Sequence, residues 1–300
     1  MRNSFVDALY EEAQKDENII LITGDLGYQL FDKFADNLPK QFINAGLTEQ
    51  SMMSMAAGIA STGKRVFVYS IANFSTLRCL EQIRNDVCYM NKSVVIVSVG
   101  SGFAYGTLGY SHHATEDIAI MRSLPNMEVV SPCDKFEADV LTRMISHTQR
   151  PTYLRLGKAG EPDLHSNYPT MAFGKFVELT SGSDGYIFFT GSVGLVALDA
   201  KGELENLGKS VSIISVPFIS QLDEEFLQKI STGKPIVVLE EHGKRGGLGS
   251  AFLEKFNELG IRADITHIAA SQEEISLTGS QDYLREMNGI STKNIVAVFR

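Results

Sequence analysis

One carboxylate, Glu49, opens a segment of small and apolar residues, NAGLTEQSMMSMAAGIA at 44–60, and no further acidic or basic residue occurs before Lys64. An acidic residue in the first turn of a helix is most often a surface group that complements the helix dipole. This helix, with Thr48 as its expected cap, is so apolar that we expect it to be buried. A buried carboxylate is costly unless it is hydrogen-bonded. We therefore interpret Glu49 as a partner for a basic ring nitrogen of a ligand.

Two adjacent histidines, His112 and His113, lie in a glycine-rich loop after a predicted strand. Ligands bind at the carboxyl ends of strands in parallel sheets. Gly100, Gly102 and Gly106 resemble a dinucleotide-binding loop only loosely, because the third glycine has the wrong spacing. Since no other histidine or cysteine lies near, acid–base work or binding of a substrate hydroxyl is favoured over a metal site.

Other side chains have two interpretations each. The cations Arg2, Arg155 and Lys158 are suited to pair with a phosphate, but each alone is equally well a solvated surface charge. Phe74 follows a strand through a short turn, which is typical of a core residue; it becomes a platform only if a planar ring sits above it near Glu49. The glycines at 246–249 precede a helix, where we favour a tight turn over an anion site.

Runs of β-branched residues alternate with helical patterns, which is typical of βα units and parallel sheets. Strands are predicted in the first half at 18–25, 65–71, 93–100, 127–132 and 151–158. An irregular stretch at 159–175 marks a domain boundary. Further strands are predicted at 184–192, 210–217, 235–243, 263–270 and 294–300. The sequence thus predicts an α/β protein of two domains, each a mainly parallel sheet flanked by helices, with Asp134 capping one of them.

Composition narrows the class of protein. The 300 residues carry a net charge of −9, which argues against nucleic-acid binding, since that needs a basic face. The three cysteines contain no CxxC pair, so buried thiols in a reducing cytosol are favoured over disulfides or zinc. No signal peptide or membrane-spanning run is recognised, and we expect a cytoplasmic protein.

The sequence resembles the transketolase family over nearly its whole length. The first half resembles the pyrimidine-binding domain in the segments NAGLTEQSMMSMAAGIASTGKRVFVYS, LEQIRNDV and GTLGYSHHATEDIAIMRSLPNMEVVSPCDKFEA. The second half resembles the transketolase C-terminal domain in DGYIFFTGSVGLVALDA, VVLEEHGKRGGLG and LTGSQDYLREMNGI. The resemblance implies a thiamine diphosphate pyrimidine-binding domain at 1–165 and a C-terminal domain at 176–300.

The resemblance implies thiamine diphosphate as the cofactor. Glu49 matches the glutamate that hydrogen-bonds a ring nitrogen of the aminopyrimidine, a catalytic role. Phe74 matches an aromatic that packs on this ring, while Ile71 and Leu77 stand where typical transketolases have aromatics. Asp25 matches an acidic residue near the cofactor.

Substrate contacts are also implied. His112 matches a histidine that contacts the sugar, and Arg2, Thr23 and Lys158 fall where transketolases contact the sugar phosphate. With the residues considered above, the expected substrate-binding set is Arg2, Thr23, His112, His113, Arg155 and Lys158, with His112 also catalytic. Two family positions differ, because Gly100 replaces a histidine and Leu108 replaces the aspartate that reads a donor hydroxyl. We therefore expect a donor or acceptor more apolar or deoxygenated than ordinary pentose phosphates.

The Gly-Asp-Gly…Asn motif that binds magnesium and diphosphate in full-length transketolases is not found in this sequence. The resemblance therefore implies the C-terminal subunit of a split transketolase, which moves a two-carbon ketol unit from a ketose to an aldose. A separate N-terminal subunit would bind the diphosphate and Mg²⁺, in an assembly of two copies of each chain (α2β2). The alternatives are a 1-deoxyxylulose-5-phosphate-synthase-like subunit, an oxo-acid dehydrogenase β-type subunit, and a non-catalytic scaffold.

Overall fold

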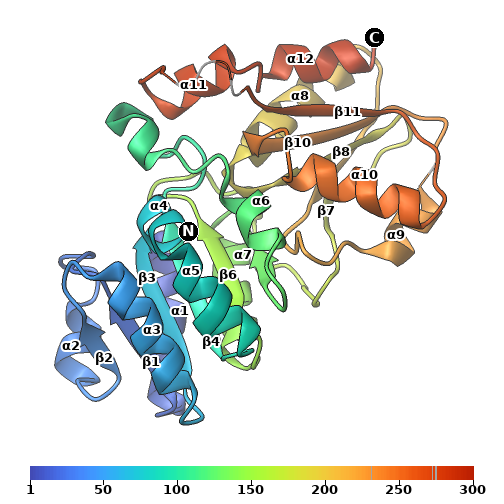
Figure 1. Ribbon diagram of the computed structural model, residues 1–300. Coiled ribbons are helices and arrows are strands. Elements are labelled where there is room, and N and C mark those ends of the chain that lie inside the picture. The colour runs from blue at the N-terminus through green and yellow to red at the C-terminus, as the bar shows by residue number, and fades with distance from the viewer. Residues whose placement is uncertain (231, 272, 274–275) are drawn as a thin grey trace.

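The computed structural model describes residues 1–300 except 231, 272 and 274–275, and the described residues form two α/β domains (Figure 1). The first contains a six-stranded sheet in the order β2-β1-β3-β4-β6-β5, in which every pair is parallel. Its strands are β1 (Ile19–Thr23), β2 (Phe42–Asn44), β3 (Arg65–Ile71), β4 (Val94–Val99), β5 (Glu128–Val130) and β6 (Thr152–Leu156).

Helices cover both faces of this sheet. α1 (Arg2–Lys15) and α7 (Lys135–Ser146) pack together on one face, and α3 (Glu49–Ala60) and α5 (Leu80–Gln82) lie on the other, as Figure 1 shows. Shorter helices are α2 (Asp32–Asn37), α4 (Ala72–Ser75) and α6 (Asp117–Arg122), and a π-helix spans Ile83–Tyr89. Alternate strand residues feed the two cores: Ile19 and Leu21 pack with α1, whereas Ile20 and Ile22 pack with α3. Burial on both faces explains the continuous apolar runs.

The second sheet has the order β11-β10-β8-β9-β7, with β7 antiparallel to β9 and the other pairs parallel. Its strands are β7 (Val177–Thr180), β8 (Tyr186–Thr190), β9 (Ser212–Ser215), β10 (Ile236–Gly243) and β11 (Ile265–Ala270). Its helices are α8 (Gly194–Asn206), α9 (Glu224–Lys229), α10 (Leu248–Glu258), α11 (Gln281–Met287) and α12 (Thr292–Val298). The predicted fold class is thus confirmed.

The strand predicted at 294–300 is wrong, because these residues belong mainly to α12. Ile295, Val296 and Phe299 are buried in the core that α12 shares with α8 and β8. A short apolar run has no clear period, so it fits one face of a short helix as well as a buried strand.

Four local predictions have different outcomes. The cap at Asp134 is confirmed, since its carboxylate accepts hydrogen bonds from two backbone N–H groups of α7. The turn before α10 is also confirmed, because the Glu240 carboxylate accepts from the backbone N–H groups of Leu248 and Gly249 and already occupies the helix start.

The prediction that α3 is fully buried is wrong. One face is buried, and the other exposes Gln50, Ser51, Ser54, Met55 and Gly58. Thr48 Oγ1 donates to the Ala45 carbonyl and does not cap α3.

Candidate functional site

Glu49 is the first residue of α3 and lies at the carboxyl end of β1. It is only 4% exposed, although the helix it opens is half exposed. Gly24, which follows β1, faces it: a Cβ at Gly24 would lie 3.7 Å from Glu49 Cγ and 3.6 Å from Met52 Sδ. The strand end and the helix therefore enclose the carboxylate from the protein side.

Arg78 covers the remaining side of this carboxylate. Its Nη1 lies 2.9 Å from Glu49 Oε2, and its Cζ lies 4.5 Å from the centre of the Phe74 ring. The Arg78 side chain is 48% exposed, whereas that of Glu49 is 5% exposed. One flat, cationic, hydrogen-bond-donating group thus pairs with Glu49 and stacks near Phe74. Such pairing offsets the cost of holding the carboxylate away from water.

Phe74 and the histidine loop form a pocket beside this pair. The ring of His112 meets Phe74 at a centroid distance of 5.5 Å and an interplanar angle of 66°. Asn73 Nδ2 fastens the loop by donating to the backbone oxygens of Ser111 (3.0 Å) and His113 (2.8 Å). The pocket has a volume of about 330 Å³ and is lined by Asn73, Phe74, Leu77, Arg78, Tyr110, Ser111, His113 and Glu116.

The two histidines have different surroundings. His112 is half-buried, and its Nδ1 lies 3.0 Å from Ser111 Oγ. His113 is 3% exposed, with Nε2 3.3 Å from the Gly106 carbonyl and its ring edge-on to Phe103. His112 therefore contacts the Phe74 ring, whereas His113, although mostly packed inside the loop, is the histidine that lines the pocket.

Thr23 and Asp25 are the sequence neighbours of Gly24 at the carboxyl end of β1. Asp25 is exposed and accepts a 3.0 Å hydrogen bond from Asn44 Nδ2, while the Thr23 hydroxyl donates to the Leu26 carbonyl. A second pocket of about 170 Å³ is lined there by Thr23, Asp25, Leu26, Gly27, Tyr28, Phe31, Asp32, Ala35, Phe42 and Asn44. Both candidates thus lie at the same sheet edge as Glu49, whereas Ile71 packs partly into the α1–α7 core.

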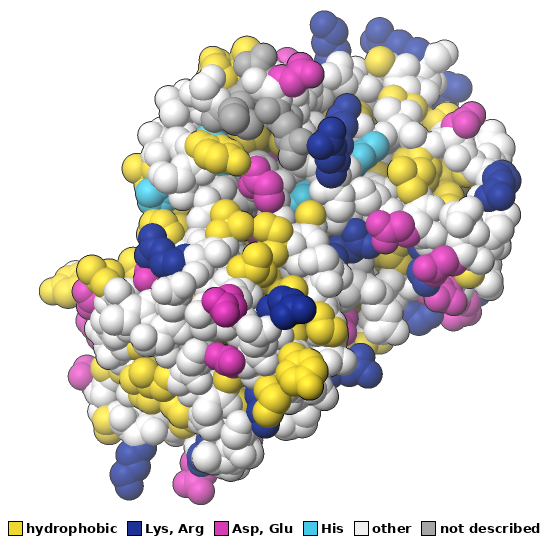
Figure 2. Space-filling model, in the orientation of Figure 1, with side chains coloured by type: hydrophobic (Ala, Val, Ile, Leu, Met, Phe, Trp, Pro, Cys, Tyr) yellow, Lys and Arg dark blue, Asp and Glu magenta, His cyan; other side chains and the backbone are white. Residues whose placement is uncertain are grey.

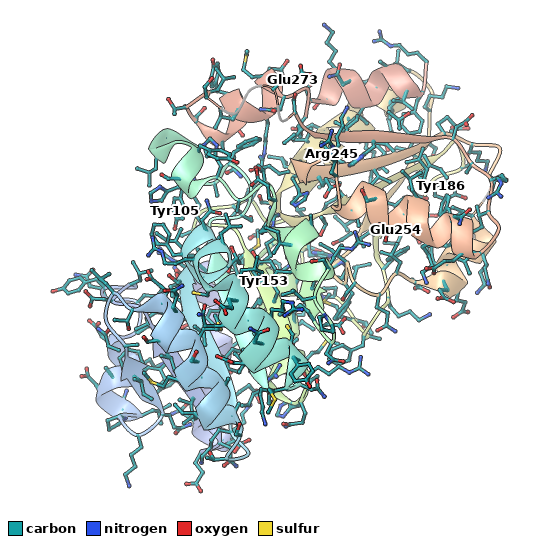
Figure 3. The ribbon with its side chains drawn as sticks, in the orientation of Figure 1. Tyr105, Tyr153, Tyr186, Arg245, Glu254 and Glu273 are labelled. Carbon is teal, nitrogen blue, oxygen red and sulfur yellow. The ribbon has the colours of Figure 1, made fainter. Side chains whose placement is uncertain are left out.

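Arg155 is not part of either pocket. It is 2% exposed, and its guanidinium contacts Asp117 Oδ2 at 2.7 Å and donates to the carbonyls of Ala114 and Glu241. The hydroxyl of Tyr153, labelled in Figure 3, donates to the same carboxylate. The Glu241 carbonyl belongs to β10, so Arg155 joins the two domains. This geometry favours a structural role over the expected phosphate contact.

Arg2 and Lys158 remain accessible. Both are half-buried; Arg2 begins α1, and Lys158 follows β6. Burial raises the pKa of Tyr105, which is labelled in Figure 3, and the positive charge of Arg2 acts against this shift. A phosphate group bound at this end of the sheet would meet cations from both elements.

The second domain anchors the histidine loop through Glu241. This buried carboxylate accepts hydrogen bonds from the Phe103 backbone N–H, from Gln281 Nε2 and from Arg285 Nε. At Gly102 (φ +57°) a Cβ would lie 2.5 Å from Glu241 Oε1, so the approach requires glycine. The sequence drew attention to Gly102 only as part of a possible dinucleotide-binding loop. Glu241 and Arg78 were not predicted, because neither belongs to a recognisable local pattern.

Two family models match this chain: the transketolase pyrimidine-binding domain over residues 1–160 and the transketolase C-terminal domain over residues 174–295. The chain therefore belongs to the transketolase family. It is 36% identical over 261 residues to one of the subunits of the apulose-4-phosphate transketolase of Phocaeicola vulgatus, covering 86% of this chain and 83% of that protein. It is 35% identical to a putative transketolase C-terminal section of Methanocaldococcus jannaschii, covering 98% and 93% of the two chains.

Solved structures support the same relationship. A split-gene transketolase, described as an inactive β4 tetramer, superposes with a TM-score of 0.91 at 30% identity, over 99% of this chain and 96% of that one. The transketolase of Leishmania mexicana shares the fold, with a TM-score of 0.79 at 19% identity, but this chain covers only 44% of it. None of the described helices is long and apolar enough to cross a membrane.

Proposed function

We propose that this chain is the cofactor-activating subunit of a split, thiamine-diphosphate-dependent transketolase, with residues 1–165 as the pyrimidine-binding domain and 176–300 as the C-terminal domain. The observation that carries this proposal is the set of contacts that the Arg78 guanidinium makes with Glu49 and Phe74. An aminopyrimidine is likewise flat, donates hydrogen bonds when protonated and stacks on aromatic rings. The residues therefore fit the cofactor that the family implies.

When bound, thiamine diphosphate supplies the nucleophilic carbon that cleaves the bond beside a ketose carbonyl. Glu49 would accept a hydrogen bond from a ring nitrogen of the cofactor and would thereby hold a proton there. Phe74 orients the ring, and the enclosed side of α3 keeps water from the carboxylate, which strengthens the bond. His112, at the edge of Phe74, is placed to bind a sugar hydroxyl or exchange a proton with it.

Arg78 must move aside for the ring to bind, and its exposed position allows this. Replacing Arg78 with methionine removes an ion pair that binding has to break. Such half-exposed pairs contribute about 1 kcal/mol or less, so we expect cofactor affinity to rise by about fivefold at most and to become less dependent on salt. Isothermal titration of the assembled enzyme with thiamine diphosphate and Mg²⁺ measures this change.

The matched control is Arg84→Met, since Arg84 Nη1 contacts only the neighbouring Asn85 side chain in the described structure. It should leave both affinity and salt dependence unchanged. Weaker binding by Arg78→Met would mean that Arg78 holds the cofactor and does not screen Glu49.

We propose that the exposed face of α3 contacts other subunits. Around the small residues of this face, four large apolar side chains are more than half exposed: Tyr28 (94%), Leu47 (76%), Tyr89 (77%) and Met90 (53%). Figure 2 shows hydrophobic side chains distributed over this face of the first domain. Apolar surface of this kind marks interaction sites. We assign it to an α2β2 assembly, in which an N-terminal subunit contributes the diphosphate and Mg²⁺ site, and the β4 tetramer of the split-gene relative supports self-association when that partner is missing.

We infer that the substrate departs from ordinary pentose phosphates. Leu108, which replaces the hydroxyl-reading aspartate, is 56% exposed in the turn before the histidines. Relatives are named for apulose 4-phosphate and, in a Clostridium species at 31% identity over 99% of this chain, for 6-deoxy-6-sulfo-D-fructose. These names support a ketose phosphate or a deoxygenated ketose as donor and an aldose as acceptor. The enzyme acts in the cytoplasm, as its three buried free thiols favour.

The test is reconstitution with the N-terminal subunit, thiamine diphosphate and Mg²⁺, followed by a screen of ketose donors with aldose acceptors. We expect two-carbon transfer that requires both chains and favours branched or deoxygenated donors over xylulose 5-phosphate. Transfer of acyl groups from 2-oxo acids, or ketol transfer without the partner, would contradict the proposal.

A further inference from the structure

A cluster of three potential metal ligands lies at the start of α7, remote from the Glu49 pocket in the sequence and sharing no residue with it. Cys133, Glu137 and His165 each present one donor atom, and these atoms all lie within 4.8 Å of one another. Cys133 and Glu137 are almost completely buried, and the His165 side chain is 11% exposed. The cluster combines a thiol, a carboxylate and an imidazole, which is a common donor set for zinc.

Asp134 fixes the orientation of the His165 ring. Its Oδ2 lies 3.0 Å from His165 Nδ1 and also accepts hydrogen bonds from the backbone N–H groups of Leu164 and His165. Its other oxygen caps α7. When Nδ1–H donates to this carboxylate, the lone pair of Nε2 points away from it. A carboxylate that orients a histidine in this way is typical of the surroundings of zinc ligands.

The free nitrogen of the His165 ring and one oxygen of the Glu137 carboxylate face each other without a hydrogen bond between them. His165 Nε2 and Glu137 Oε1 are 3.9 Å apart, which is too long for a hydrogen bond. Neither atom has a partner at ordinary hydrogen-bond geometry among the described residues, although the Ser215 hydroxyl and the Cys133 thiol lie beside the Glu137 carboxylate. The other oxygen of Glu137 accepts from the Cys133 backbone N–H at 2.8 Å, so the carboxylate is held in place. Buried polar atoms without partners are costly, and a cation between them removes this cost.

We propose that Cys133, Glu137 and His165 bind one Zn²⁺ ion, with a water molecule as the fourth ligand. The Cys133 thiol releases its proton to solvent when the ion binds. Calcium and magnesium prefer oxygen donors alone, whereas sulfur with nitrogen favours zinc. Zinc lies about 2.0–2.3 Å from such ligands, which sets about 3.4 Å between neighbouring donors. The 3.9 Å between Nε2 and Oε1 must therefore shorten by about 0.5 Å. No helix or strand is described between β6 and β7, so the segment that carries His165 can adjust without breaking a regular element.

The site would have a structural consequence. Cys133 and Glu137 belong to the first domain, and His165 lies in the segment that leads to the second. A zinc ion would fasten this connecting segment to α7. It would thus stabilise the folded chain, by an amount that grows with the logarithm of the free Zn²⁺ concentration divided by the dissociation constant.

The experiment uses the purified full chain after removal of metal ions, with Zn²⁺ and Co²⁺ as probes. Competition with a chromophoric chelator and elemental analysis should give one Zn²⁺ per chain, and the melting temperature should rise. Co²⁺ should give a tetrahedral visible spectrum and a near-ultraviolet sulfur-to-cobalt charge-transfer band. Cys133→Ser should abolish this band, and His165→Gln should weaken Zn²⁺ binding at least about tenfold.

The control variant is Cys88→Ser, because Cys88 is also buried and free but lies outside the cluster. It should bind both ions as the unchanged chain does. If the chain binds no Zn²⁺, or if Cys133→Ser keeps the charge-transfer band, the proposal is overturned. A His165 ring that bridges Asp134 and Glu137 as a cation would give that result, with His165→Gln lowering the melting temperature equally with and without zinc. The test uses no cofactor or partner subunit, so it is independent of the proposed function.

Discussion

Glu49→Gln should lower the turnover number of the reconstituted enzyme by at least about a hundredfold. The substitution preserves shape but replaces a charged hydrogen-bond acceptor with a neutral amide, which holds a protonated ring nitrogen far less strongly. Proton-transfer groups of this kind contribute about 10²–10⁴ to rate. The measurement is single-turnover and steady-state ketol transfer with a saturating donor, with the assembly state checked by sedimentation.

Glu81→Gln is the matched control, because Glu81 is an exposed acidic residue in α5, close to Phe74 in the sequence. It should retain full turnover. Retention of more than half of the activity by Glu49→Gln, in an intact assembly, would contradict the cofactor role. The scaffold alternative makes two different predictions. The unchanged assembly would show no ketol transfer, and Glu49→Gln would leave its cellular function intact.

The second large effect concerns the buried pair of Arg155 and Asp117. Both side chains are 1% exposed, so Arg155→Met leaves an uncompensated buried carboxylate. Breaking such a pair costs about 3–5 kcal/mol. We expect this loss in the free energy of unfolding, measured in urea near neutral pH, together with early loosening of the domain contact at Glu241. Arg150→Met, at a side chain that is 72% exposed, should change stability by less than about 0.5 kcal/mol.

The same pair predicts a pH dependence. Burial raises the pKa of Asp117, but the charges of Arg155 and His242 and hydrogen bonds from Arg155 and Tyr153 outweigh it and leave the pKa below its ordinary value of 3.8. A carboxylate whose pKa is lower in the folded chain stabilises the fold at pH values above its pKa in the unfolded chain. This stabilisation is lost as the pH falls through its pKa in the folded chain. Asp117→Asn should therefore destabilise most at neutral pH, and its difference from the unchanged chain should shrink below about pH 4. A difference that is constant with pH would contradict this assignment.

The sequence was sufficient for most strands and for the burial of Glu49 at the start of a helix, because both depend on local patterns. Strand runs that are buried on two faces are continuous in apolar residues, and a carboxylate that begins an apolar helix is unusual. The cofactor was inferred from the family resemblance, and the two family models confirm this resemblance at the level of domains. The short strand β7 and the helix α12 were missed because so few residues show no reliable period.

The other site residues depend on tertiary contacts. Arg155 and Asp117 are separated by 38 positions, and no motif links them, so the cation was assigned to a phosphate. Arg78 and Glu49, 29 positions apart, meet because the helical turn at Leu77–Cys79 packs against α3. His165 and Asp134, 31 positions apart, meet only where the irregular segment reaches the start of α7, so the spacing of the cysteines alone could not indicate the proposed cluster.

The contact of Glu241 with the histidine loop limits how this protein can be recombined. A hybrid that joins one relative's first half to another's second half must keep glycine at 102 opposite glutamate at 241. With alanine at 102, or with a shorter acid at 241, the loop that carries His112 would lose its contact with the second domain even though every residue in the ligand pocket was native. The two halves have therefore to be exchanged as a matched set.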